Sequence, residues 1–322
     1  MEKQKWYLDE PFKAFWEKGY RDKLISTMGG PSVEVFEMLP FIKPGYKVID
    51  LGCGEGRNAL FLAQHGCEVT AVDISPSGIE KVNIAAKALG VEIRTIVCDL
   101  NDYVVDDKYD VVLAHTSLHF LSRKSWRKLL SDLKESTKLN GFHSLTVFLS
   151  TPKYPIPEEI MAAGHKLSFA IGELKEFYNN WEIIRYDSYL KQDQHPGIAI
   201  HSHYTEKILC RKNYNKDTWG KDYIIKSLYS NQPDLSIENF NKIRLGDSED
   251  TIISICGEPD NVNEVDFGST AVGAKNILVK KYFLKDLFYG KTGFQLINNE
   301  VRGKYLYASE PVRVLFNEKG LP

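Results

Sequence analysis

The chain has 322 residues, with 41 Lys and Arg against 43 Asp and Glu, so its formal net charge is −2. Its composition, 43% hydrophobic and 26% charged, is that of a globular protein and excludes global disorder. The balanced charge lacks the basic stripe typical of nucleic-acid binding, and no run reaches the roughly 20 apolar residues of a membrane helix. At roughly 100–200 residues per domain, the length predicts two domains.

The cysteines and the N-terminal residues bear on the compartment. The five cysteines are scattered and form no C-x-x-C pair, so we expect neither a disulfide framework nor a metal site. The N-terminal stretch is charged and aromatic and does not resemble a secretory signal. We therefore expect a cytoplasmic protein that binds no metal, no nucleic acid and no membrane.

Residues 1–40 predict a helical lid, because aromatic side chains recur there at helical spacing. These aromatics, which fit either a core or a lid over a ligand, are Trp6, Tyr7, Phe12, Phe15, Trp16 and Tyr20. Gly29-Gly30-Pro31 breaks the pattern, and Ser32 then fits the N-cap of a second helix.

From Lys47 onward, strands alternate with helices, which is typical of a parallel, doubly wound sheet. The expected strands are 47–51, 68–72, 92–97, 109–114 and about 142–149, and the expected helices are 57–65, 77–89 and 123–138. Residues 150–165 hold three prolines and predict a loop or lid, and 172–178 predict a short helix. Residues 181–189 and 198–211 have no helix between them, so we expect an antiparallel pair that closes one edge of the sheet.

The polar residues 212–220 fit a linker, which divides the chain into a domain at 1–212 and a domain at 213–322. The second part predicts a small α+β unit with an antiparallel sheet. Its expected helices lie near 221–230 and 248–256, and its expected strands near 261–267, 275–288, 293–298 and 303–309.

The strongest functional signal is D-L-G-C-G-E-G at 50–56, which follows a strand and opens a helix. Its spacing is G-x-G-x-G, and Arg57 stands where the dinucleotide fingerprint has its third glycine. Asp50, directly before the loop, would repel a pyrophosphate and suits a cationic ligand such as the ammonium of S-adenosylmethionine.

Two more acids end the next two strands. Asp73 could accept hydrogen bonds from both ribose hydroxyls, and Asp99 could accept one from the adenine amino group. Taken singly, each fits a solvated loop acid equally well, but three acids at successive strand ends favour cofactor binding. The expected cofactor residues are Tyr20, Asp50, Gly52, Cys53, Gly54, Gly56, Asp73, Ile74, Asp99, Leu100 and His115.

Residues 31–211 resemble class I S-adenosylmethionine-dependent methyltransferases and, more narrowly, the tellurite-resistance methyltransferase family. The matching segments are 50–58 (DLGCGEGRN), 71–75 (AVDIS), 98–101 (CDLN), 172–174 (GEL) and 181–184 (WEII). The resemblance implies a Rossmann-like, mostly parallel seven-stranded sheet whose last strand is antiparallel. It implies methyl transfer to a small-molecule acceptor, with tellurite-like or selenite-like oxyanions as the family's acceptors.

The chain departs from that family at the substrate side. The family has a His-Arg pair after the sixth strand and an arginine in the seventh, which are taken to act on the oxyanion. Here the same stretches read Leu190-Lys191-Gln192-Asp193 and His201-Ser202-His203-Tyr204. The resemblance therefore implies methyl transfer more directly than it implies tellurite as the acceptor.

Methyl transfer needs a general base only when the nucleophile must lose a proton, so the lack of an obvious catalytic dyad is compatible with it. The substrate side is expected at the ends of the fourth and fifth strands, in the loop and at the edge pair. Candidate residues are His115, Thr116, His119, Phe120, Pro152, Tyr154, His195, His201 and His203. As catalytic residues we predict His119, His203 and Arg57, although each fits a structural role as well.

The C-terminal part carries no catalytic constellation. Its residues 243–260 resemble small helix-plus-sheet domains of the β-lactamase-inhibitor and outer-membrane-assembly-lipoprotein type. Ser248 would cap a helix that Gly257 ends. Such domains bind partners, so this part is expected to mediate protein–protein contact or self-association.

Three functions remain open at this stage. The first is a methyltransferase acting on a tellurite-like or selenite-like oxyanion or a soft nucleophile. The second is a methyltransferase for an ordinary metabolite oxygen or nitrogen. The third is a non-catalytic S-adenosylmethionine-binding sensor whose C-terminal domain contacts a partner.

Overall fold

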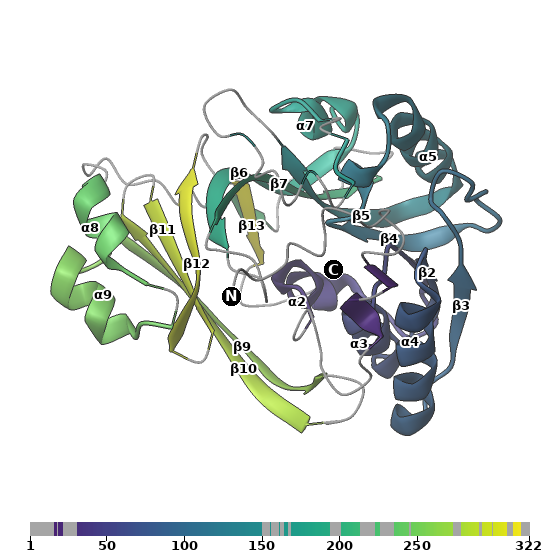
Figure 1. Ribbon diagram of the computed structural model, residues 1–322, viewed down its shortest axis with the longest axis horizontal. Coiled ribbons are helices and arrows are strands. Elements are labelled where there is room, and N and C mark those ends of the chain that lie inside the picture. The colour runs from purple at the N-terminus through teal and green to yellow at the C-terminus, as the bar shows by residue number, and fades with distance from the viewer. Residues whose placement is uncertain are drawn as a thin grey trace, which may run out of the picture.

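Figure 1 shows the computed structural model of the chain. It describes residues 16–17, 19–21, 31–149, 155, 161, 164–166, 169–193, 201–212, 223–225, 235–244, 246–272, 278–289, 292–297, 299–307 and 312–316. Outside these residues lie several predicted positions, namely Trp6, Tyr7, Phe12, Phe15, Pro152, Tyr154 and His195.

The first part of the chain is the predicted doubly wound sheet. Its parallel strands are β1 (Lys47–Leu51), β2 (Glu68–Asp73), β3 (Ile93–Val97), β4 (Tyr109–His115) and β5 (Thr137–Leu149), in the order β3-β2-β1-β4-β5. The helices between them are α3 (Arg57–Gln64), α4 (Pro76–Leu89) and α5 (Arg123–Ser136). The order reverses between β1 and β4, which is where open α/β sheets bind their ligands.

Local sequence explains the ends of these helices. The Ser75 hydroxyl accepts from the Gly78 amide and caps α4, Pro76 follows it, and Gly90 ends the helix in the left-handed conformation. The Ser122 hydroxyl caps α5 by accepting from the Ser125 amide.

The sheet continues with two long antiparallel strands, β7 (His201–Arg211) and β6 (Glu182–Asp193). β7 pairs antiparallel with β5, and β6 pairs antiparallel with β7, which confirms the predicted seven-stranded order. The short helix α7 (Glu173–Phe177) precedes β6.

The expectation that this pair closes the sheet edge is wrong. β12 (Glu300–Tyr307) pairs antiparallel with β6, with Leu306 opposite Leu190, and β13 (Val312–Phe316) pairs with β6 nearer its start. A free edge of β6 would leave backbone donors and acceptors unpaired, and these two strands satisfy them. The sheet therefore runs on through β12, β11 (Thr292–Ile297), β10 (Leu278–Tyr289) and β9 (Asn261–Val272).

The C-terminal strands carry the helices α8 (Ile237–Lys242) and α9 (Glu249–Cys256), which Figure 1 shows at the left. The Ser248 hydroxyl caps α9 and Gly257 ends it, as predicted. The predicted helix at 221–230 is wrong, because residues 223–225 form the strand β8 (Tyr223–Ile225), which pairs with β13. The helix α8 and the strand β13 were not predicted from the sequence.

Three separate hydrophobic cores hold these layers together. One face of the first sheet packs against α3, α4 and α2 (Val33–Met38) through residues such as Val48, Val82 and Val35. The opposite face packs against α5 and α7 through residues such as Ile49 and Trp126. The third core lies between α8, α9 and the C-terminal strands. None of the described helices is long and apolar enough to cross a membrane.

Candidate functional site

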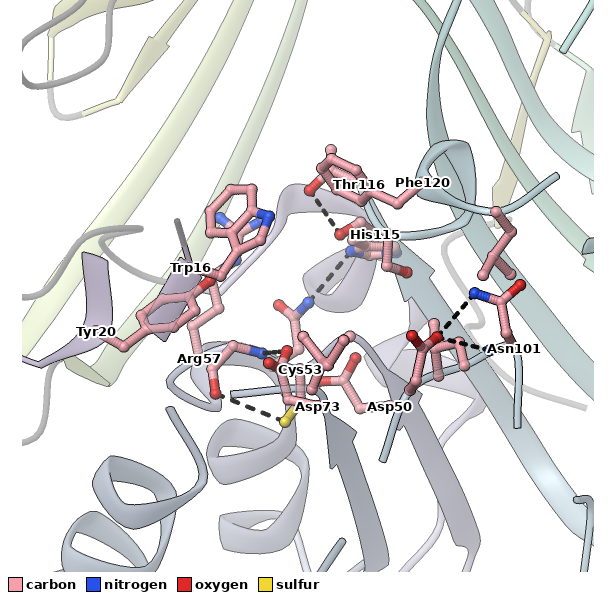
Figure 2. A pocket seen from close by; sticks show the side chains of 18 of the residues that line it. Trp16, Tyr20, Asp50, Cys53, Arg57, Asp73, Asn101, His115, Thr116 and Phe120 are labelled. Atoms are coloured by element: carbon pink, nitrogen blue, oxygen red, sulfur yellow. Dashed lines mark hydrogen bonds between the residues drawn. The ribbon is translucent and has the colours of Figure 1, made fainter. Parts of the chain in front are cut away.

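A cavity of about 240 Å³ lies at the carboxyl ends of β1, β2 and β4, where the strand order reverses. Figure 2 shows it with Trp16 and Tyr20 on one side, Asn101 on the other, and Asp50 and Asp73 below. The residues that line it are Trp16, Tyr20, Asp50, Gly52, Cys53, Gly54, Arg57, Asn58, Asp73, Ile74, Asp99, Leu100, Asn101, His115, Thr116, Ser117, Phe120, Leu121 and Lys166.

The glycine loop forms the floor of this cavity. Gly52 and Gly54 have φ values of +72° and +58°, a conformation that side chains disfavour. A Cβ on Gly52 would lie 2.3 Å from the Cβ of Ser117, and a Cβ on Gly54 would lie 2.7 Å from the Tyr20 hydroxyl. Gly56 does not line the cavity, because it is the N-cap of α3 and packs on Val82. Two of the three loop glycines therefore shape the site directly.

Asp50 is buried beneath the loop, with 2% of its surface exposed. Its carboxylate accepts from the Ala59 amide, but Oδ2 has no hydrogen-bond partner among the described residues. Burial raises the pKa of Asp50 to about 7, against the opposing charge of Arg57. A buried acceptor without a partner is costly, so this oxygen is suited to a donor supplied by a ligand.

Asp73 ends β2 beside the loop. Its Oδ2 accepts from the Gly54 amide at 2.8 Å and its Oδ1 accepts from the Ser75 amide at 2.9 Å. Burial raises the pKa of Asp73, although these backbone hydrogen bonds act in the opposite direction. Because each carboxylate oxygen has a further lone pair, the oriented side chain can still accept from two hydroxyl groups.

Asp99 follows β3 at the other end of the cavity. Its Oδ1 accepts from both the backbone and the side-chain amide of Asn101, at 2.9 Å each, as Figure 2 shows. Leu100 beside it is buried and supplies an apolar surface. The Asp99 carboxylate, the Asn101 amide and the apolar Leu100 side chain together suit a flat group with a polar edge, such as adenine.

His115 ends β4 and is held at both ring nitrogens. Nδ1 lies 3.2 Å from the Asn58 amide nitrogen and 2.9 Å from the Ser32 hydroxyl, and Nε2 lies 2.9 Å from the Ser144 hydroxyl. The Asn58 amide nitrogen can only donate, so Nδ1 accepts and the ring proton is on Nε2. Burial lowers the pKa of His115 to about 4, so the ring is neutral. Ser32, which directly precedes α2 as expected, donates its hydroxyl to this histidine.

The turn after β4 shapes the upper wall. Thr116 has a φ of +59°, an unusual conformation for a β-branched residue, and its hydroxyl donates to the His115 carbonyl oxygen at 2.6 Å. The 3₁₀ turn η2 (Leu118–Phe120) then presents Phe120 to the cavity. His119 points elsewhere: it is 1% exposed and stacks on His165, with ring centroids 4.1 Å apart.

Trp16, Glu17 and Tyr20 form part of the roof of the cavity. Trp16 stacks on Tyr20 and meets Phe120 edge-on, with centroids 5.9 Å and 5.8 Å apart. The Glu17 carboxylate accepts from the Ser75 hydroxyl at 2.6 Å and from the Ser77 amide at 3.0 Å. Burial would raise the pKa of Glu17, but these hydrogen bonds outweigh it and hold the pKa below its ordinary value. The roof is thus fastened to the N-terminus of α4, where a negative charge is favoured.

The cavity brings together most of the predicted cofactor residues and one predicted catalytic residue, Arg57. Gly56 and His119 lie away from its lining, as described above. His203 lies in β7 opposite Lys191, and its side chain is outside what the structure describes. Ser117, Leu121 and Lys166 also line the cavity and were not predicted from the sequence. Lys166 reaches the cavity because its backbone amide donates to the His119 carbonyl oxygen at 3.0 Å, a contact across 47 residues that no local pattern encodes.

The donor set fits S-adenosylmethionine. The orphaned Asp50 Oδ2 matches an ammonium, the oriented Asp73 matches a ribose diol, and Asp99 with Leu100 matches an adenine. Among the described residues, no group of three His, Cys, Asp or Glu side chains could hold a metal ion.

Comparisons with known proteins agree with this geometry. The chain is 31% identical to the probable S-adenosyl-L-methionine-dependent methyltransferase TehB of Haemophilus influenzae over 154 residues, 48% of this chain and 52% of that protein. It is 34% identical to the magnesium-protoporphyrin O-methyltransferase of Rhodobacter capsulatus over 36% of this chain and 49% of that protein. The chain thus spans about half the length of these curated relatives.

A solved structure and a family model give the same result. The crystal structure of TehB from Haemophilus influenzae superposes with a TM-score of 0.52 and 26% identity, covering 63% of this chain and 67% of that one. The model of the family described as tellurite resistance protein TehB matches residues 14–197, which is more than half of the chain and includes every residue that lines the cavity. With its class I methyltransferase fold, the chain belongs to the TehB family.

Proposed function

We propose that the protein transfers the methyl group of S-adenosylmethionine to a small molecule whose nucleophilic atom already has a free lone pair at neutral pH. Tellurite-like or selenite-like oxyanions and soft nucleophiles such as thiolates belong to this class. When bound, the cofactor supplies an electrophilic methyl group on a sulfonium sulfur. The protein's task is then to position the acceptor and to exclude water, which can supply about 7–11 kcal/mol of the barrier.

The state of His115 is the observation that carries this proposal. A general base for an alcohol acceptor should have a free, titrating nitrogen near the reacting atom. His115 has both nitrogens engaged and a pKa of about 4, so it is a poor base. Asp50 has a pKa of about 7, but Figure 2 places it on the glycine-loop side, away from Thr116 and Phe120. We therefore assign Asp50 to the cofactor and expect no base.

The acceptor is proposed to bind between Trp16, Thr116, Phe120 and Lys166. Aromatic side chains on this wall exclude water, and the Lys166 ammonium can hold an anionic acceptor by a charge-assisted hydrogen bond. Lys166 would thereby take the role assigned in the family to the arginine after the sixth strand and to the arginine in the seventh. Arg57 lines the cavity near Asp50, and we assign it to the cofactor's carboxylate end.

We further propose that residues 1–212 form the methyltransferase domain and 213–322 an accessory domain. The separate core between α8, α9 and the C-terminal strands supports this division, although backbone pairing at β6 joins the two parts.

The test is an assay of S-adenosylhomocysteine formation with tellurite, selenite, thiols, amines and alcohols, with volatile products measured in the headspace. We expect turnover with the first three acceptor classes and none with alcohols. Lys166→Met should raise the KM for an anionic acceptor about tenfold or more, as expected for the loss of one charged hydrogen bond, and leave cofactor affinity unchanged. Turnover only with alcohols would refute the lone-pair proposal. Cofactor binding without turnover for any acceptor would favour the sensor function.

A further inference from the structure

A buried cluster of four charged residues lies behind the cavity wall. Glu34 of α2 is 2% exposed, and its Oε1 lies 2.6 Å from Lys207 Nζ of β7 and 3.7 Å from Arg185 Nη1 of β6. Arg185 Nε also lies 2.7 Å from Oδ2 of the fully buried Asp187. Among the described side chains of this cluster, two acids thus lie against two bases.

The position of Arg185 in the sheet and the charge state of Glu34 both bear on this cluster. Arg185 lies at an irregularity of the β6–β7 ladder, where the register shifts between Ile183 and Arg185. Burial would raise the pKa of Glu34, but Lys207 and Arg185 outweigh it and hold that pKa well below its ordinary value. Glu34 is therefore ionised.

The cluster is adjacent to the cavity wall. Ser32, two residues before Glu34, contacts both His115 and Asn58, which line the cavity. Burial lowers the pKa of both His115 and Arg57, and the Glu34 carboxylate is the strongest influence opposing it at each of them. The charge of Glu34 is thus felt at two residues of the wall.

We propose that Glu34 is a specificity-determining residue for the cofactor. Its buried carboxylate, shared between Lys207 and Arg185 behind His115, keeps this wall from becoming net positive and so favours the cationic sulfonium of S-adenosylmethionine over the neutral thioether of S-adenosylhomocysteine. The inference rests on the proposed function in that it takes S-adenosylmethionine to be the cofactor. Its consequence is weaker inhibition by the product, because the two ligands differ only by a methyl group and its charge.

The size of the effect follows from Coulomb's law. If the Glu34 carboxylate and the sulfonium are taken to lie about 10 Å apart, unit charges at an effective dielectric constant of about 20 change a dissociation constant by roughly fifteenfold. Lys207 and Arg185 will partly reorient when Glu34 is lost, so we expect a change of about three- to tenfold. A packing defect alone would weaken both ligands equally.

The experiment is a calorimetric measurement of the Kd of both ligands for the full chain, below the melting temperature of each variant. The quantity compared is the ratio of the Kd of S-adenosylmethionine to that of S-adenosylhomocysteine. Glu34→Gln should raise this ratio about three- to tenfold, and Lys207→Met should lower it by a similar factor. The double variant Glu34→Gln with Lys207→Met should return close to wild type. Asp132→Asn, which removes an exposed ion pair with Lys128 on α5, is the matched control and should change nothing.

The outcomes separate the two proposals. Wild-type protein that binds neither ligand would contradict the proposed function itself. Binding with a ratio that stays constant in both single variants, or that moves in the same direction in both, would overturn the role of Glu34. If Glu34→Gln does not fold, Lys207→Met still decides the sign, because its charge change is opposite and its side chain is 15% exposed.

Discussion

The proposed contact between Asp73 and the ribose of the cofactor gives the sharpest single-residue prediction. Both oxygens of this carboxylate already accept from backbone amides, Oδ2 from Gly54 and Oδ1 from Ser75. The change Asp73→Asn keeps the size of the side chain but replaces one acceptor with a donor. That NH₂ group would face a backbone N–H, and one ribose hydroxyl would lose its acceptor.

The expected loss can be worked out from these contacts. A hydrogen bond to a charged group contributes about 1.5–3 kcal/mol, and 1.4 kcal/mol is a factor of about ten in Kd. Asp73→Asn should therefore raise the Kd of S-adenosylhomocysteine about 10- to 150-fold. Asp73→Ala should cost more, because it removes both acceptors and also releases the glycine loop at Gly54.

The assay is isothermal titration calorimetry with S-adenosylhomocysteine, accompanied by thermal melting to establish that each variant is folded. Asp132→Asn on α5 makes the same chemical change at a side chain that is 42% exposed, and it should bind like the wild type. An unchanged Kd in a folded Asp73→Asn protein would refute the assignment of Asp73 to the ribose.

Three further predictions concern the roof, the floor and the domain boundary. Glu17→Gln weakens the hydrogen bonds that hold Glu17, and with it the neighbouring Tyr20, on Ser75. For a loss of about 1 kcal/mol, the dissociation rate of S-adenosylhomocysteine in stopped-flow experiments should rise about threefold to tenfold. An unchanged rate would show that the roof does not limit release. The pKa of Asp50 is about 7, and its carboxylate form attracts the cofactor's ammonium, so affinity for S-adenosylmethionine should increase as the pH rises from about 6 to 8. Asp50→Asn should abolish this pH dependence. The same pH dependence in the variant would assign it to another group. A chain ending at Lys212 keeps every cavity-lining residue but exposes the edge of β6. Its Kd for the cofactor should stay within about threefold of the wild-type value, and its exposed strand edge should make it self-associate in sedimentation experiments. Loss of cofactor binding would place the domain boundary elsewhere.

Local patterns in the sequence predicted the cofactor half of the site. A short apolar strand, a glycine turn and an acid at the strand end are all encoded within a few residues, so Asp50, Gly52 and Asp73 could be placed before the fold was known. The parallel order of the strands then brings their carboxyl ends together.

The acceptor half could not be placed in this way. His115 and His119 lie four residues apart on the same turn, but the left-handed Thr116 and the η2 turn send His119 into an aromatic stack while Phe120 faces the cavity. Lys166 reaches the cavity through one backbone hydrogen bond to a distant carbonyl group. Neither the burial of His119 nor the position of Lys166 is indicated by a periodic pattern in the sequence.

Long-range strand pairing was the other unpredictable feature. The strand character of residues 303–309 was visible, but nothing in the sequence indicated that they would pair with β6. The edges of β6 and β12 have no distinguishing side-chain pattern, because backbone groups alone make the ladder. The sequence pattern therefore predicted the strand itself but not the continuity of the sheet across β6 and β12.

A crystal structure of the protein grown with S-adenosylhomocysteine is the most direct test of the cofactor site on which the rest depends. We predict one molecule in the cavity, with the ribose hydroxyls on Asp73, the amino group at Asp50 Oδ2, the adenine beside Asp99 and Leu100, and the sulfur facing Thr116 and Phe120. The ligand bound at another place, or bound in this cavity with its ribose away from Asp73, would contradict it.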